Sequence, residues 1–166
     1  MIFITLGSQK FQFNRLLKKV DELIENGTIN EEVFAQIGAS DYKPQHFSYT
    51  EFMDNDTFSE YEKKADIVIT HGGTGAIIGA VKQGKKVIAV SRLAKYGEHV
   101  DDHQVQLLRQ FDDMGIIEAC YDVDNLSDCY KKVLKTDYIP YVSNTKTIIG
   151  SIEEYILSAF GKVNNE

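Results

Sequence analysis

Two glycine-containing segments of the sequence have the composition of ligand-binding turns. Each follows a run of apolar and β-branched residues, Ile2–Leu6 in one case and Asp66–Thr70 in the other. Glycine lets backbone N–H groups approach a ligand, and the N-terminus of a following helix offers unpaired donors and partial positive charge. A phosphate-bearing ligand is therefore predicted to bind Gly7, Ser8 and Gln9 together with His71, Gly72, Gly73, Thr74 and Gly75. The alternative is that both turns are only tight connections.

Another dense group of polar side chains occupies residues 98–104. His99 and His103 are four residues apart, so on a helix they could chelate zinc with a carboxylate. The same residues also suit a helix start, with Asp101 or Asp102 as the cap and both histidines in solvent. The interpretation that we favour is contact of Asp102 and Gln104 with the hydroxyls of a sugar next to the phosphate, and the family resemblance given below adds His103 between them.

Other motifs point to chemistry less specifically. The spacing Gly73-x-Gly75-x-x-x-Gly79 is one residue longer than the dinucleotide fingerprint, and Arg92 could contact a 2′-phosphate, so a nicotinamide-dependent oxidoreductase stays an alternative. The sequence contains no Walker A loop and no nucleophile elbow. Acidic triplets, which could hold a divalent ion, occur at Asp54-x-Asp56 and Asp122-x-Asp124 but are expected in solvated loops.

Composition limits the classes of function. The net charge of −7 argues against a nucleic-acid partner, because such binders need a basic face. No apolar run approaches the roughly 20 residues that span a bilayer. Cys120 and Cys129 are too few for a disulfide scaffold and are expected to be reduced packing residues of a cytoplasmic protein.

The elements that must position these residues alternate between short strands and helices. Such alternation predicts an α/β fold, a doubly wound, mainly parallel, Rossmann-like sheet, with one domain over residues 1–160 and a frayed tail at 161–166. With strand order 3-2-1-4-5-6, the ligand crevice would lie between the first and fourth strands, where both glycine turns emerge. An apolar helical stripe from Ile148 to Phe160 could dock on a partner or cover the sheet, and we expect it to cover the sheet.

Three motifs that follow one another along the chain resemble those of a known family. The segments Ile67–Gly75, Gly84–Ile88 and His99–Gln104, with the opening Phe3–Phe11, resemble the C-terminal domain of glycosyltransferase family 28. They are also similar to the PssE-type subunits of bacterial capsule and exopolysaccharide synthesis. A further similarity is to the donor-binding subunit of the eukaryotic two-subunit UDP-GlcNAc transferase.

The resemblance implies one C-terminal-type half of a GT-B enzyme that binds a UDP-sugar. Transfer of a hexose (galactose, glucose, glucuronic acid or GlcNAc) to a lipid-linked acceptor would then require a membrane-anchored, acceptor-binding partner subunit. That partner would recruit this chain to the inner face of the membrane. No cofactor or metal is expected. The general base is unassigned, with His99 and His103 as candidates.

One departure from the resemblance affects the nucleotide. Related enzymes place a glutamate for the ribose hydroxyls eight residues after the loop histidine, and here that position is Gly79. The ribose contact must therefore come from elsewhere. A non-catalytic enhancer subunit is the alternative that this departure favours.

Overall fold

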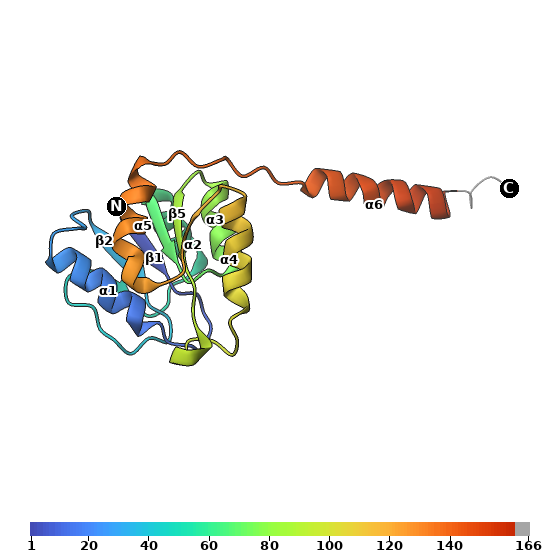
Figure 1. Cartoon of the computed structure of the whole chain (residues 1–166). Coiled ribbons are helices and arrows are strands. Elements are labelled where there is room, and N and C mark those ends of the chain that lie inside the picture. The colour runs from blue at the N-terminus through green and yellow to red at the C-terminus, as the bar shows by residue number, and fades with distance from the viewer. Residues whose placement is uncertain (162–166) are drawn as a thin grey trace.

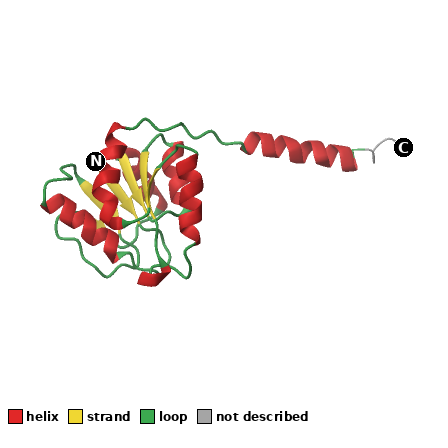
Figure 2. Ribbon diagram, in the orientation of Figure 1, coloured by secondary structure: helices red, strands yellow, loops and turns green. Residues whose placement is uncertain are grey.

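The apolar runs of the sequence form six parallel strands of a single sheet (Figures 1 and 2). The computed structural model describes residues 1–161. The strands pair in the order β3-β2-β1-β4-β5-β6, the order for which the ligand crevice was expected between the first and fourth strands. Their bounds are β1 (Ile2–Thr5), β2 (Val33–Gln36), β3 (Ser48–Thr50), β4 (Ile67–Thr70), β5 (Lys86–Val90) and β6 (Glu118–Cys120).

Helices cover both faces of this sheet, as the continuously apolar strands require. On one face lie α1 (Asn14–Glu25) and α5 (Leu126–Lys135), and on the other α2 (Asn55–Lys64), α3 (Thr74–Lys82) and α4 (His103–Asp113). Two short 3₁₀ turns, η1 (Ala94–Tyr96) and η2 (Val123–Asn125), lie in the connections after β5 and β6. Helix α5 was not expected from the sequence, although Leu126, Tyr130 and Val133 recur at helical spacing.

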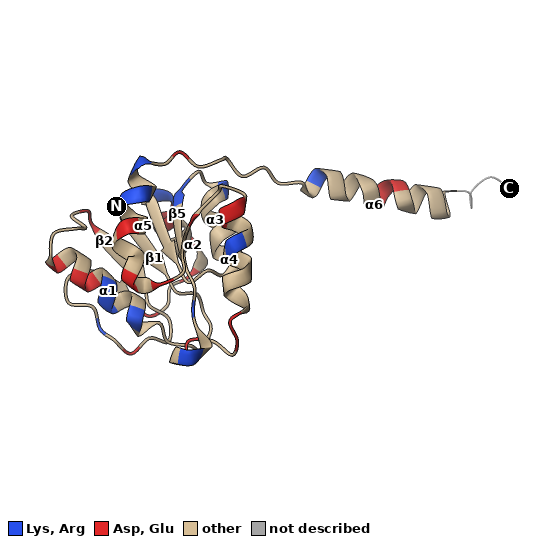
Figure 3. Cartoon of the chain, viewed as in Figure 1, with Lys and Arg blue, Asp and Glu red and all other residues tan. Residues whose placement is uncertain are grey.

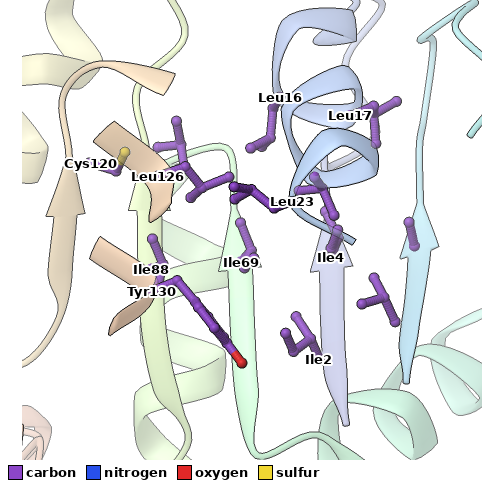
Figure 4. Packing of buried hydrophobic residues seen from close by; sticks show 14 of the residues in the cluster. Ile2, Ile4, Leu16, Leu17, Leu23, Ile69, Ile88, Cys120, Leu126 and Tyr130 are labelled. Carbon is purple, nitrogen blue, oxygen red and sulfur yellow. The ribbon is translucent and has the colours of Figure 1, made fainter. Parts of the chain in front are cut away.

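Alternate residues of each strand supply two separate cores. Ile2 and Ile4 of β1 face α1 and α5, and Figure 4 shows them with the leucines of α1 and Tyr130 of α5. Phe3, between them, points to the opposite face and packs edge-on against Phe58 of α2, with ring centroids 5.2 Å apart. This packing fixes β1 between the two helical layers.

The last helix, α6 (Thr145–Phe160), does not cover the sheet, so that expectation was wrong. It extends away from the domain (Figure 1) and buries none of its side chains. The physical reason is that the five other helices already occupy both sheet faces. Figure 3 shows few charges on α6, and Ile148, Ile152 and Ile156 are about half exposed.

Over residues 1–161, no helix has both the length and the apolar character needed to cross a membrane. Gly161 ends α6, and the remainder of the predicted tail, 162–166, lies outside the described residues.

Candidate functional site

A cleft of about 450 Å³ lies at the carboxyl ends of β1 and β4, where the strand order reverses. The two strands pair with Thr5 opposite Thr70, so the turns that leave them start side by side. Of the residues predicted to hold a phosphate, the cleft is lined by Gly7, Ser8, Gln9, His71, Gly73 and Gly75. Gly72 and Thr74 belong to the second turn but do not line the cleft.

His71 is enclosed by glycine on two sides. A Cβ atom on Gly7, whose φ is +70°, would stand 2.7 Å from the imidazole Cε1 atom. A Cβ atom on Gly73 would stand 2.5 Å from Nε2. These distances leave no room for a side chain at either position, so the glycines are needed to seat the imidazole.

The His71 imidazole is neutral at physiological pH. Its burial, and then the nearby Arg92 guanidinium, lower its pKa to about 4. Nδ1 lies 3.3 Å from the carbonyl oxygen of Thr5, which can only accept, so we assign the proton to Nδ1. His71 therefore contributes hydrogen-bonding capacity to the cleft at neutral pH, and no positive charge.

Arg92, after β5, holds the first glycine turn at both ends. Its Nη2 atom donates to the carbonyl oxygens of Leu6 at 2.9 Å and Phe11 at 3.2 Å. The side chain is 1% exposed, and burial lowers its pKa to about 10, so it stays charged at neutral pH. The suggestion that Arg92 contacts the 2′-phosphate of a dinucleotide is thus wrong, because the guanidinium is buried against the backbone.

The segment 98–104 lies outside the cleft wall. Asp102 Oδ1 accepts from the backbone N–H of Ala94 at 2.8 Å, and Gln104 Oε1 accepts from the N–H of Arg92 at 3.3 Å. His103 is the exposed first residue of α4. The sugar contacts predicted for Asp102, His103 and Gln104 stay a prediction, while the bonds of Asp102 and Gln104 anchor the loop after β5.

The zinc alternative needs both histidines on one helix, and the structure does not place them so. His99 precedes α4, so the two imidazoles do not stand one turn apart on a helix. Among residues 1–161, no three His, Cys, Asp or Glu side chains gather as potential metal ligands. The acidic triplets also have local roles: Asp54 caps α2 by accepting from the N–H of Thr57, and Asp122 caps η2.

Several residues of the cleft were not singled out by sequence. Thr5 and Gln36 come from the ends of β1 and β2, and α2 supplies Asn55, Phe58 and Glu62. Glu62 is 5% exposed and lies beside Gly79 of α3. No local pattern could have paired them, because 17 residues separate them and only the packing of α2 against α3 brings them together.

The geometry and the sequence agree on one family. The profile of the glycosyltransferase family 28 C-terminal domain matches residues 1–155. The chain belongs to this family.

Two curated relatives of this family 28 domain are each named UDP-N-acetylglucosamine transferase subunit ALG13. The protein of Candida glabrata is 32% identical over 94 residues, which are 56% of this chain and 46% of that one. The human protein is 28% identical over 131 residues, 72% of this chain and 11% of the human one. The chain thus spans less than half the length of either relative.

Solved structures support the family 28 fold. The glycosyltransferase of kitacinnamycin has a TM-score of 0.58 at 16% identity, over 81% of this chain and 34% of that one. MurG of Acinetobacter baumannii has a TM-score of 0.57 at 16% identity, over 80% of this chain and 40% of that one. A solution structure of ALG13 has a TM-score of 0.58 at 17% identity, over 91% of this chain and 93% of that one. At these identities the likeness shows the fold, a Rossmann-like domain that corresponds to one part of the two larger chains.

Another cleft of the family 28 domain, about 410 Å³, opens at the amino ends of the strands and is lined by Met1, Asp66 and Lys85 among others. In open parallel sheets, ligands bind beyond the carboxyl ends of the strands at the switch point. We therefore assign the functional site to the cleft between the two glycine turns.

Proposed function

We propose that this chain binds the donor, a UDP-sugar, for an inverting glycosyltransferase whose acceptor-binding half is a partner chain. The cleft between the two glycine turns carries the proposal. It lies at the switch point of the sheet, and it opens at the N-terminus of α3, where Gly75 and Ala76 form part of its wall.

The backbone at this helix start suits a diphosphate. Gly73 precedes α3, and no side chain caps the helix there, so the N–H groups of its first turn are available to a ligand. In the proposed reaction an acceptor hydroxyl attacks the anomeric carbon, the bond to the diphosphate breaks and UDP leaves. The same N–H groups and the helix dipole would stabilise the charge that develops on the diphosphate, without a metal ion.

Deprotonation of the acceptor is assigned to the partner chain. His99 and His103 do not line the cleft, and His71, whose pKa is lowered to about 4, is a weak base. The curated relatives are named as transferase subunits, which supports a two-chain enzyme. The exposed apolar side chains of α6 support a partner as well. The lipid-linked acceptor, the membrane anchor of the partner and a capsular product stay predictions from the sequence motifs.

Calorimetric titration of the purified chain tests the proposal. The ligands are UDP, the UDP derivatives of galactose, glucose, glucuronic acid and GlcNAc, and NADP. We expect UDP and at least one UDP-sugar to bind in the micromolar to millimolar range and NADP not to bind. If no UDP ligand binds to the folded chain, alone or with its partner, the donor-binding proposal is wrong and the enhancer alternative takes its place.

Gly75→Leu should block this cleft without harming the fold. A Cβ atom on Gly75 meets nothing within 4 Å, and Leu is a better helix former than Gly by about 0.5–1 kcal/mol. We expect the affinity for UDP to fall at least tenfold, about 1.4 kcal/mol, with an unchanged or higher melting temperature. Gly150→Leu, at an equally open helical position of α6, is the matched control and should bind UDP as the parent chain does. Unchanged UDP affinity in Gly75→Leu would place the ligand elsewhere.

A further inference from the structure

Glu62 is the acidic side chain in the wall of the cleft, and it is almost fully buried. Among the described lining residues no other Asp or Glu occurs, and no Lys or Arg. The ion pairs of the described chain do not include Glu62. Its burial, the larger effect, raises its pKa, although a hydrogen bond from Gln83 acts in the opposite direction. A hydrogen bond donated by a neutral group of a ligand would stabilise the charged form of this carboxylate.

One carboxylate oxygen is available for such a donor. Gln83 Nε2 donates to Oε2, whereas Oε1 accepts no hydrogen bond within residues 1–161. Gly79 is the nearest part of α3, where an added Cβ atom would lie 3.4 Å from Oε1. The absence of a side chain at Gly79 therefore leaves this oxygen open to the cleft that both residues line.

The Oε1 atom of Glu62 lies one helical turn along α3 from the proposed phosphate site. Gly75 and Gly79 are four residues apart, so they lie on the same face of the helix and about 6 Å apart along its axis. A ligand with its diphosphate at the helix N-terminus would thus reach Glu62 with a group a few bonds away. In a nucleoside diphosphate that group is the ribose.

From this arrangement we infer that Glu62 binds the 2′- and 3′-hydroxyl groups of the ribose of the bound nucleotide. The inference rests on the proposed function of the same cleft. Carboxylates bind ribose hydroxyls in other doubly wound folds. A divalent cation is a poor alternative, because Ca²⁺ and Mg²⁺ need several oxygen ligands and the cleft offers one carboxylate. The negative charge also selects against nucleotides with a 2′- or 3′-phosphate.

The test compares UDP, 2′,3′-dideoxy-UDP and inorganic pyrophosphate by calorimetry on the full chain and on Glu62→Gln. A charged hydrogen bond predicts that the parent chain binds UDP at least tenfold more tightly than the dideoxy analogue. Glu62→Gln should lower the affinity for UDP at least tenfold and remove most of the preference for UDP over the dideoxy analogue. The affinity for pyrophosphate should not change. Glu60→Gln, an exposed residue of the same helix, is the control and should match the parent chain.

Two further comparisons keep the test decisive. If Glu62→Gln does not fold, the preference of the parent chain for UDP over the dideoxy analogue still decides, together with Gly79→Leu, which should cover Oε1 and weaken UDP. UDP binding with equal affinity for the dideoxy analogue would overturn the role of Glu62 and leave the proposed function intact. A Glu62→Gln defect confined to UDP-sugars, with UDP unaffected, would also overturn it, because UDP contains no hexose. Failure of every UDP ligand to bind would overturn both.

Discussion

Arg15→Met is expected to lower the free energy of unfolding by about 3 kcal/mol, because it leaves a buried carboxylate without its partner. Arg15 on α1 donates from Nε and Nη2 to both carboxylate oxygens of Glu98, at 3.0 and 2.9 Å. The Glu98 side chain is 1% exposed, and it also accepts from the N–H of Leu93. Urea denaturation of the full chain measures the loss, and methionine retains most of the Arg15 stem.

The control for this variant is Lys19→Met. Lys19 lies on the same helix and pairs with Glu22, which is 58% exposed, so the loss should stay within about 1 kcal/mol. The double variant Arg15→Met/Glu98→Gln should recover part of the stability, because it removes the uncompensated charge. Equal losses of unfolding free energy in Arg15→Met and Lys19→Met would show that the buried charge of Glu98 is not stabilised by the Arg15 guanidinium.

Acidification from pH 6.5 to about pH 4 is expected to destabilise the fold by about 3 kcal/mol through His71 alone. The pKa of His71 is lowered from 6.5 in the unfolded chain to about 4 in the folded one. In this window the unfolded chain binds a proton that the folded chain excludes, so stability rises with pH and is fully regained above pH 6.5. Below about pH 4 both states are protonated and this loss stops growing.

Other groups of the protein also contribute to the pH dependence of stability. The quantity to measure is therefore the difference in unfolding free energy between variants. The pKa values of Asp54 and Asp66 are lowered, so their contributions are lost at lower pH, whereas the pKa of Glu62 is raised and acts with the opposite sign. We expect the slope of unfolding free energy against pH to be shallower in His71→Gln than in the parent chain. His103→Gln, which replaces an exposed imidazole, should keep the parent slope. Parallel slopes in all three proteins would mean that His71 is not held neutral by the fold.

The local patterns of the sequence predicted the parts of the structure that depend on neighbours along the chain. Strand and helix alternation predicted a mainly parallel, doubly wound sheet, and the glycines after the first and fourth strands predicted where a cleft would open. The parts that failed depend on contacts across the fold. α6 is apolar enough to cover a sheet, but five helices already do so.

The same limit applies within the site. The absence of an acidic residue at Gly79 was visible in the sequence, but the carboxylate of Glu62 beside it was not, because it arrives from another helix. Asp102 and Gln104 are predicted sugar contacts, and the structure shows that both also bind the backbone after β5, a role that the sequence did not indicate. Polar composition alone does not distinguish a side chain that awaits a ligand from one already paired.

The lack of Lys and Arg among the described residues of the cleft has a consequence for how an anion reaches it. Sites that attract phosphate through exposed cations lose affinity and association rate as ionic strength rises. Here the partial positive charge of the site comes from backbone N–H groups at the start of a helix. The whole chain has a net charge of −7, which repels an incoming nucleotide at a distance. Added salt would screen that repulsion, so association of UDP should become faster with ionic strength, while the rate of release changes little.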